Sequence, residues 1–287
     1  MNRLQEKRNK TRLYLDGDII LYKAAIVSES RVAWEDGVTS THFDIQEGAT
    51  GASLIIRGAL SRLRDQHNID DPRVYLCLSC RTDLGYRKKL FPDYKSGRGQ
   101  KPLGLGALRS PEGLSLIQQH LGRPVVVALK DTLEADDIMG IAMGNGHIAV
   151  TDDKDLKTCP GTLIKLSPDE KGWHELHEIS RHEANANLMM QWMTGDSTDS
   201  IPGLPGFGPV KAKKTLDAWI DSTLPWEEMA TKVLELYESK GLGDKALPYF
   251  YSVYILRNKS DTLDLPDPFA VFSTHADTEG CLGDARA

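Results

Sequence analysis

Acidic side chains follow several of the apolar segments that are typical of buried strands. Asp16 ends the segment 12–16, and further acids come shortly after the apolar runs 73–78, 125–129 and 147–151. In an open parallel α/β sheet, the loops after the carboxyl ends of the strands share one edge, where ligands bind. The carboxylates expected to converge there are Asp16, Asp83, Glu134, Asp136, Asp137, Asp153 and Asp155.

Carboxylates gathered in this way need counter-charge, because like charges disfavour ionisation of their neighbours. Hard divalent cations are the natural solution, and ligands that offer only oxygen favour Mg²⁺ or Mn²⁺ over zinc. Two such ions, roughly 3.5–4 Å apart, are the usual arrangement for hydrolysing a phosphodiester. The alternatives are structural: the residues from Asp131 to Glu134 could form a helix-capping box, and Asp153 and Asp155 could be turn residues.

A glycine-rich loop in the segment 193–216 leads into a lysine-bearing helix. A G-x-G turn at a helix N-terminus exposes backbone N–H groups that can hold a phosphate, and lysines add positive charge. The residues expected to contact DNA in this way are Gly206, Gly208, Lys211, Lys213 and Lys214. Asp196 and Asp199 precede the turn and could complete a second metal site. A simple loop between two helices is the alternative.

A basic strip follows the second expected strand, over residues 85–102. Its aromatic residues alternate with cations, as they do on surfaces that bind single-stranded nucleic acid. Its glycines and prolines indicate a mobile loop that substrate would order. The alternative is an amphipathic helix with a solvated basic face.

Strands alternate with helices over the first part of the chain, which predicts an α/β fold with a mainly parallel central sheet flanked by helices. A β-hairpin is expected around Asp36-Gly37. The expected strands are 12–16, 73–78, 125–129, 147–151 and 162–166, and the expected C-terminal helices are 183–194, 209–220, 226–240 and 244–257. The predicted division is an α/β core over 1–180 with an arch or loop at 84–110, a helical DNA-binding region over 181–265, and a loose tail over 266–287.

The overall charge argues against nucleic-acid binding, because the net charge is −6 and the pI is about 5.8. The charges are segregated, however. Residues 81–101 hold seven basic residues and two acids, whereas residues 132–155 hold six acids and one lysine. The four cysteines are interpreted as reduced core residues of a cytoplasmic protein, and no signal peptide or membrane segment is expected.

Five motifs, in this order along the chain, together resemble the 5′-nuclease family. They are LDGDIILYKA (15–24), YRKKLFPDYKSGR (86–98), EADDIMG (134–140), TDDKDL (151–156) and GDSTDSIPGLPGFG (195–208). The family includes flap endonucleases, the 5′-nuclease domain of bacterial DNA polymerase I and phage exonucleases. The chain looks most similar to the stand-alone phage 5′→3′ exonucleases, and the resemblance covers about residues 13–216.

The resemblance implies a role for each matching residue. Asp16, Glu134 and Asp136 would hold a first Mg²⁺ or Mn²⁺ ion with Asp137 nearby, and Asp153, Asp155 and Asp196 a second ion with Asp199 in support. Lys23, Arg87, Lys95 and Arg98 match catalytic cations that contact the scissile phosphate or the 5′ end, and Tyr94 matches an aromatic near the terminal base. The segment 195–208 matches a helix–three-turn–helix element that also binds K⁺ in the family.

Two positions depart from the family pattern. Many members carry an Asp at the end of the second strand, where this chain reads LCLSC, and Asp83 is the nearest substitute. Ser200 stands where Asn is usual.

The expected activity is metal-dependent 5′→3′ exonuclease or flap-endonuclease cleavage of double-stranded DNA at a 5′ end, nick or flap, in phage DNA replication or recombination. Removal of RNA primers from RNA–DNA hybrids, an RNase H activity, and contact with replication proteins are extensions that the family suggests. One alternative is a non-catalytic DNA-junction binder with an eroded metal site. Another is an RNA-directed nuclease with a related acidic core.

Overall fold

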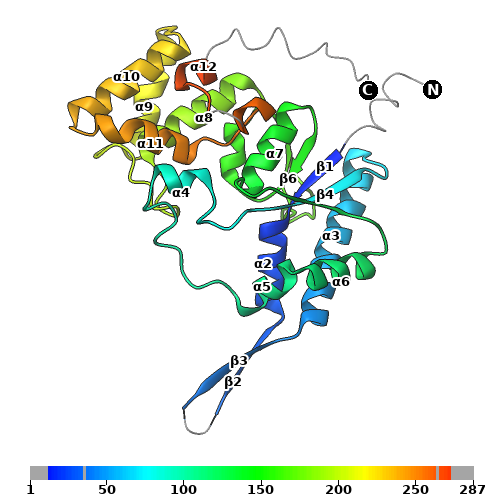
Figure 1. The fold of residues 1–287 in the computed structure, drawn as a ribbon. Coiled ribbons are helices and arrows are strands. Elements are labelled where there is room, and N and C mark those ends of the chain that lie inside the picture. The colour runs from blue at the N-terminus through cyan, green and yellow to red at the C-terminus, as the bar shows by residue number, and fades with distance from the viewer. Residues whose placement is uncertain (1–11, 35–36, 263–264, 273–287) are drawn as a thin grey trace.

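A six-stranded sheet forms the centre of the molecule (Figure 1). The computed structural model describes residues 12–34, 37–262 and 265–272. The strand order is β5-β4-β1-β6-β7-β8, and every neighbouring pair is parallel except β7 and β8. The strands are Arg12–Asp16 (β1), Arg73–Leu78 (β4), Val126–Leu129 (β5), Ile148–Val150 (β6), Gly161–Ile164 (β7) and Leu176–Ile179 (β8). The predicted mainly parallel sheet is therefore confirmed, and only the short antiparallel edge strand β8 was missed.

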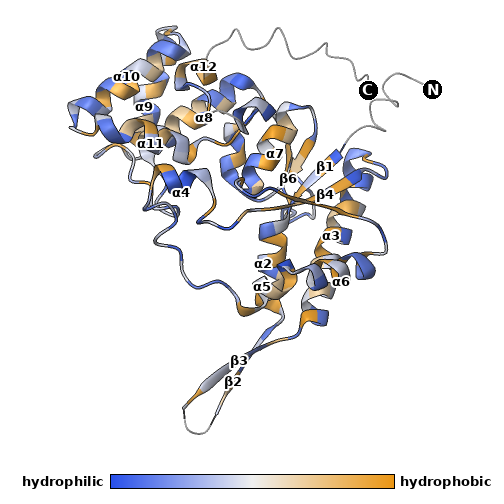
Figure 2. Cartoon of the chain, viewed as in Figure 1, coloured by the Kyte–Doolittle hydropathy of each residue, from blue (hydrophilic) through white to orange (hydrophobic). Residues whose placement is uncertain are grey.

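Helices cover both faces of this sheet. On one face, Leu13 and Leu15 of β1 share a core with α2, α3, α5 and α6. On the other, Cys77 of β4 and Ala149 of β6 pack with α7. Figure 2 shows apolar residues concentrated in the central strands and on the helix faces turned toward them. The helices are Gly17–Val27 (α2), Ile45–His67 (α3), Leu103–Arg109 (α5), Pro111–Leu121 (α6) and Ala135–Gly144 (α7).

Helix α2 begins directly at the end of β1, which places the first acidic residue. Asp16 caps the helix by accepting a hydrogen bond from the Ile19 backbone N–H at 3.0 Å. Gly17 allows this tight junction, since a Cβ there would lie 2.6 Å from the carbonyl oxygen of Cys77 in β4. The sequence Asp16-Gly17 therefore fixes a carboxylate at the sheet edge.

The C-terminal helices pack around large aromatic side chains. Trp192, Tyr237, Phe250 and Phe272 are all fully buried in one core. The helices are Arg181–Thr194 (α8), Pro209–Asp221 (α9), Trp226–Ser239 (α10), Gly243–Val253 (α11) and Pro268–Phe272 (α12). The predicted helices are thus present, although α11 ends at Val253, four residues before its predicted end at 257.

The loose tail predicted for 266–287 is wrong for its first residues. Pro268–Phe272 forms a short helix, and Phe272 stacks on Trp226 with ring centroids 6.4 Å apart. Burial of this aromatic ring holds α12 against the helical core. Residues 273–287 lie outside the described part of the chain.

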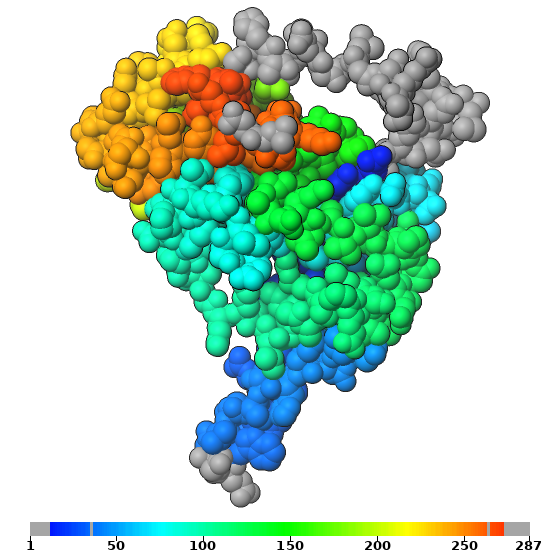
Figure 3. Space-filling model, viewed as in Figure 1, coloured from blue at the N-terminus to red at the C-terminus, as the bar shows by residue number. Residues whose placement is uncertain are grey.

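A β-hairpin projects from the body of the protein (Figures 1 and 3). Its strands are Glu29–Ala33 (β2) and Thr39–Phe43 (β3), as the sequence predicted, while the predicted turn residues 35–36 lie outside the described chain. Phe43 anchors its base, where Gly104 lies so close that an added Cβ would meet the ring at 2.1 Å.

The segment 84–110, which the sequence predicted as an arch or loop, runs from the helical region to the α/β core. It holds only a short helix, Tyr86–Leu90 (α4), and α5, with residues 91–102 crossing between them without helix or strand (Figure 1). Both ends are docked: Phe91 packs edge-on against Tyr249 of α11 at 5.2 Å, and Leu105 of α5 belongs to the core beside α2. Figure 3 shows this cyan segment against the orange C-terminal helices. None of the described helices is long and apolar enough to cross a membrane.

Candidate functional site

Two of the predicted acidic segments meet through a hydrogen bond between strand ends. The Asp16 carboxylate, 3% exposed, accepts the Thr151 hydroxyl at 2.6 Å. Thr151 follows β6, which pairs with β1, so the loop that carries Asp153 and Asp155 starts beside Asp16. Asp153 in turn caps a 3₁₀ turn, Lys154–Thr158 (η1), by accepting the Asp155 N–H at 2.8 Å.

Carboxyls from separate segments lie close enough to shift the pKa values of one another. Burial raises the pKa of Asp16 to about 7, with added repulsion from Asp18 and Asp153. Burial also raises the pKa of Asp136, and Asp153, Asp16 and Glu134 raise it further.

A third carboxyl, that of Asp155, is repelled by an acidic residue that follows helix α8. Burial raises the pKa of Asp155 to about 7, and the charges of Asp153 and Asp196 add to the effect. Glu134, Asp136, Asp155 and Asp196 line one cavity, and the charges of Asp16 and Asp153 act on members of this group.

A small cavity of about 20 Å³ lies between these carboxyls and α8. Its acidic lining consists of Glu134, Asp136, Asp155, Asp196 and Asp199. Burial and mutual repulsion raise the pKa values of Asp136 and Asp155 in this lining, and all the acidic donors are oxygen, the type that a hard divalent cation prefers. Among the described residues, no group of three or more His, Cys, Asp or Glu side chains stands close enough to hold a metal ion.

Glu134 differs from Asp136 and Asp155, because protein cations already neutralise it. It accepts hydrogen bonds from Lys95 Nζ at 2.5 Å and the Tyr94 hydroxyl at 2.7 Å, and Arg87 Nη1 lies 3.3 Å away. Burial alone would raise its pKa, but the charges of Arg87 and Lys95 outweigh burial and bring the pKa to about 2. Glu134 is therefore ionised and paired within the protein.

Arg87 and Asp137 form a buried ion pair rather than open ligands. The guanidinium, on a residue 3% exposed, donates to both Asp137 carboxylate oxygens at 2.7 and 2.8 Å and to the Tyr254 carbonyl at 2.7 Å. Asp137, fully buried, also accepts the backbone N–H of Glu134 in a capping box. A capping box is thus present, but it is formed by Glu134 and Asp137 and not by Asp131 and Glu134 as the alternative expected. Arg87 does not present its charge to a phosphate in this structure.

Other residues of the basic strip that were expected to contact substrate are also engaged within the protein. Tyr94, 3% exposed, is not available to stack on a base, because its hydroxyl is turned onto Glu134. Arg98 Nη2 lies 2.5 Å from Asp199, and the backbone N–H of Lys95 donates to the Asp199 carbonyl at 2.8 Å. The strip therefore lies across the acidic cavity and ties it to the loop 195–208.

Two predicted site residues lie apart from the cavity. Asp83 pairs at 2.9 Å with Arg81, and both side chains are largely exposed. The Lys23 ammonium binds Asp152 at 2.6 Å and the Ser167 hydroxyl at 2.8 Å. The substitution of Asp83 for the family's strand-end acid is therefore not supported by its position, and Lys23 needs a new partner to reach substrate.

The loop 195–208 joins α8 to α9 through close backbone contacts. Asp196 and Ile201 exchange two backbone hydrogen bonds of 2.8 Å. Gly203, at φ 67°, lies so near Thr194 that a Cβ would meet its backbone at 2.4 Å, so no larger residue fits. This compact turn holds the Asp196 carboxyl at the acidic cavity.

Helix α9 presents the expected basic face to solvent. Gly208 caps its N-terminus without a side-chain hydrogen bond, so the first backbone N–H groups have no capping side chain. Lys211 lies over the Phe207 ring at 4.0 Å, Lys213 is paired with Asp217 at 2.6 Å, and Lys214 is exposed. The turn at Gly206 has φ 78°. The N-terminus of α9 and its exposed lysines therefore lie at the end of the loop 195–208.

Two polar residues that line or support the site were missed from the sequence. Thr151 holds Asp16, and Gln191 of α8 lines the acidic cavity. Thr151 opens the motif TDDKDL and could have been found there. Gln191 stands one helical turn before Gly195, but no charge or spacing distinguishes it from an ordinary helix residue.

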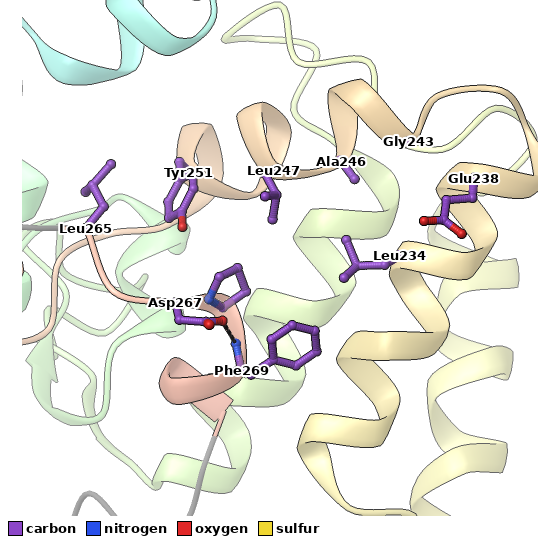
Figure 4. Close-up of a pocket in the computed structure, with 10 residues that line it drawn as sticks. Leu234, Glu238, Gly243, Ala246, Leu247, Tyr251, Leu265, Asp267 and Phe269 are labelled. Carbon is purple, nitrogen blue, oxygen red and sulfur yellow. Dashed lines mark hydrogen bonds between the residues drawn. The ribbon is translucent and has the colours of Figure 1, made fainter.

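A larger hollow, of about 600 Å³, lies elsewhere, between α10, α11 and the segment 265–269 (Figure 4). Its lining includes the apolar side chains of Leu234, Leu247 and Phe269 and the acids Glu238 and Asp267. It holds none of the clustered carboxyls, and nothing in the structure shows what would cover it. The smaller acidic cavity is therefore the better candidate site.

Sequence comparison finds relatives among the flap endonucleases, although no family model matches the chain. Flap endonuclease Xni of a Shewanella species is 28% identical over 144 residues, which cover 47% of this chain and 54% of that protein. Flap endonuclease Xni of Shewanella amazonensis is 30% identical over 149 residues, with 46% and 54% covered. The chain thus spans about half the length of the curated relatives it matches.

Structure comparison finds the same fold in phage proteins. A T5 protein co-crystallised with metal ions aligns with a TM-score of 0.53 and 12% identity, over 89% of this chain and 92% of that one. A mutant of T5 5′-exonuclease aligns with a TM-score of 0.51 and 12% identity, over 89% and 91%. At this identity the likeness concerns the fold alone, and together with the sequence relatives it supports the 5′-nuclease family that the motifs predicted.

Proposed function

Since the sequence relatives and the fold both support the 5′-nuclease family, we propose that this chain is a metal-dependent 5′-nuclease that hydrolyses phosphodiesters near 5′ ends of DNA. The observation that carries the proposal is the gathering of carboxyls from four separate segments with pKa values raised by burial and mutual repulsion. Such a cluster costs stability unless cations balance it, so a functional reason for its presence is needed.

Asp16, Asp136, Asp153, Asp155 and Asp196 would hold Mg²⁺ or Mn²⁺. When bound, the ions supply a nucleophilic water at neutral pH and charge stabilisation for the leaving oxygen. The Thr151 hydroxyl keeps the Asp16 carboxylate oriented, and the Asp153 carboxylate keeps Asp155 in its turn. Burial by α8 and α11 limits access of bulk water to these groups.

The residues of α9 would hold the duplex. Its uncapped N-terminus binds a backbone phosphate, and the exposed Lys211 and Lys214 add charge on the same side. Because such contacts read no bases, the grip is independent of sequence. The K⁺ ion implied for the loop 195–208 belongs to the same proposal.

Lys95 and Arg98 would bind the 5′ terminal phosphates after leaving Glu134 and Asp199. Both are paired with carboxylates of the acidic cavity. A metal ion would bind these carboxylates in place of the two cations. An exchange of partners, lysine to phosphate and carboxylate to metal, would couple substrate binding to metal binding. Exonuclease and flap cleavage, and removal of RNA from RNA–DNA hybrids during replication, are the finer activities that we propose.

The test is a panel of 5′-labelled nicked, flap and blunt duplexes, with Mg²⁺ or with a chelator. We expect short labelled products only with the metal. Asp153→Asn should abolish cleavage yet retain DNA binding, whereas the exposed Asp83→Asn, as a matched control, should cut as wild type does. Equal cleavage in chelator would refute the proposal.

One observation favours a second candidate, a DNA-junction binder without nuclease activity. Lys95 and Arg87 neutralise Glu134 and the Tyr94 hydroxyl donates to it, which would suit a site that no longer takes metal. In that case the protein would shift junction DNA in Mg²⁺ or Mn²⁺ without cutting it, and neither wild type nor Lys95→Ala would bind the metal.

A further inference from the structure

The turn η1, which follows β6 and sets Asp153 and Asp155, is closed at its far end by Thr158. The Thr158 hydroxyl donates to the Asp155 carbonyl at 2.7 Å, and the Asp153 carboxylate accepts the Asp155 N–H at 2.8 Å. A 3₁₀ turn of five residues has weaker backbone hydrogen bonds than an α-helix and is too short to be stable by itself. The placement of both acids therefore depends on what holds Thr158.

Arg257, from the chain just after α11, holds Thr158. Its Nε and Nη2 donate to the Thr158 carbonyl oxygen at 3.0 and 2.6 Å, and its Nη1 donates to the Asn185 side-chain oxygen at 2.8 Å. Arg257 is 4% exposed and Thr158 is 3% exposed, so bulk water cannot replace these bonds. The positive charge lies at the carbonyl end of the turn, where a cation is favourable.

Helix α8 supports the same end of η1. Asn187 donates to the Lys157 carbonyl at 3.0 Å, and Asn185, on the same helix, accepts from Arg257. The last two carbonyl groups of η1 are therefore both held by side chains of the helical region. Their partners come from α8 and from the segment after α11.

The backbone of Arg257 is itself fixed. The Asp261 carboxylate accepts the Arg257 backbone N–H at 3.0 Å and the Tyr254 hydroxyl at 2.9 Å. On the other side the chain passes close to α7, since a Cβ at Gly144 would lie 2.1 Å from the Arg257 carbonyl oxygen. Burying a guanidinium is costly, and an apolar side chain would fill this space at a lower cost. A role in holding η1 explains why a charged residue stands there.

We propose that Arg257 is a positioning residue for the nuclease site: by holding the Thr158 carbonyl, it fixes the turn that sets Asp153 and Asp155. The helical region thereby determines the geometry of acids that follow a strand of the central sheet. The contact is independent of how the carboxyls titrate, because arginine stays charged and its partner in the turn is a backbone carbonyl. The inference rests on the proposed function, since it assumes that these acids hold a cation.

The test has two readouts, and neither of them requires catalysis. Hydrogen–deuterium exchange of the peptide 151–160, without metal, reports the opening of the turn, and electron paramagnetic resonance reports Mn²⁺ affinity. Arg257→Lys keeps the charge but loses the double donation to one carbonyl. It should raise exchange in this peptide severalfold through local opening and weaken Mn²⁺ binding about tenfold, the scale of loss when a group that orients a metal ligand is changed.

A second variant tests the next contact along. Thr158→Val keeps the carbonyl that Arg257 holds but deletes the hydroxyl that ties it to Asp155, so it should also weaken Mn²⁺ binding, whereas Thr158→Ser should keep wild-type affinity. The matched control is Arg123→Lys. Arg123 also donates to a backbone carbonyl, that of Pro72 at 2.8 Å, but at the end of β4 away from the acids. This control should change neither readout.

The outcomes separate the two proposals. If wild type binds no Mn²⁺, the proposed function falls, and the role of Arg257 at a metal site falls with it. If wild type binds Mn²⁺ and both Arg257→Lys and Thr158→Val bind it within twofold of wild type, only the role of Arg257 falls, even where the melting temperature is lower. If Arg257→Lys does not fold, as judged by circular dichroism, equal Mn²⁺ affinities of Thr158→Val and Thr158→Ser would overturn the inference.

Discussion

The two halves of the acidic cluster treat buried negative charge in opposite ways. On one side, Glu134 and Asp137 are paired with Arg87 and Lys95, and the pKa of Glu134 falls to about 2. On the other, burial and mutual repulsion raise the pKa values of Asp16 and Asp155 to about 7. The first half is balanced by cations of the protein itself, whereas burial and repulsion leave the second half without such a balance. Removing an acid from the first half should therefore lower the stability of the protein, because it breaks an ion pair. Removing an acid from the second half should not lower the stability, because it removes repulsion.

The largest expected effect is on catalysis in the unbalanced half. Asp136→Asn should reduce Mg²⁺-dependent cleavage by about 10³-fold or more, equivalent to roughly 4 kcal/mol of transition-state stabilisation lost with a metal ligand. Because the substitution also removes repulsion, the melting temperature without metal should not fall. Single-turnover cleavage of a labelled flap and thermal melting check both parts, and a lower melting temperature would contradict the comparison.

A large loss of stability is expected in the balanced half. Arg87→Met leaves Asp137 buried without a counter-charge and should lower the free energy of unfolding by about 3–5 kcal/mol. Urea denaturation followed by fluorescence measures the change. The control is Arg81→Met, which breaks the exposed pair with Asp83 and should cost no more than about 1 kcal/mol. Similar losses in the two variants would remove the distinction between the pairs.

Metal addition should stabilise the protein through the unbalanced half. At 100 times its dissociation constant, Mg²⁺ should raise the free energy of unfolding by about 2.7 kcal/mol, because it binds the folded state only. The rise in melting temperature on adding Mg²⁺ measures this effect. It should largely vanish in Asp155→Asn but persist in Asp83→Asn, and a rise retained in Asp155→Asn would place the ion elsewhere.

The smallest expected effect concerns the lysines of α9. Lys214→Ala should reduce the slope of log affinity for duplex DNA against log salt concentration by about one unit. Lys213→Ala should reduce it less, because Asp217 already pairs with that ammonium. Fluorescence anisotropy at several salt concentrations, in Ca²⁺ to prevent cleavage, distinguishes the two, and equal slopes would show that the ion pair opens on DNA.

The sheet and the convergence of acids were predictable because they depend on local pattern. Period-2 apolar runs followed by acids, as at Leu15 and Asp16, specify both a strand and the edge that its carboxylate occupies. The short strand β8 was not predictable, because its four residues, LHEI, hold little apolar signal and pair only at the edge.

The basic strip was misjudged because its charges are balanced by residues remote in sequence. Arg87 and Tyr94 look like exposed substrate contacts until Glu134 and Asp137, some 40 to 50 positions later, are placed beside them. The composition of a segment gives its charge but does not show which residues pair with that charge. Gln191 shows the same limit, since nothing in the sequence indicates that this uncharged side chain lines the acidic cavity.

The contact of Arg87 with both Asp137 and the Tyr254 carbonyl has a consequence for how the molecule unfolds. The guanidinium joins α4 to α7 of the sheet layer and to the chain just after α11, so neither the α/β half nor the helical half can open without exposing it. Amide hydrogens in both halves should therefore exchange with solvent through one shared global unfolding event, rather than through separate openings of each half. One arginine would make a single cooperative unit of two regions that the sequence alone presents as separable.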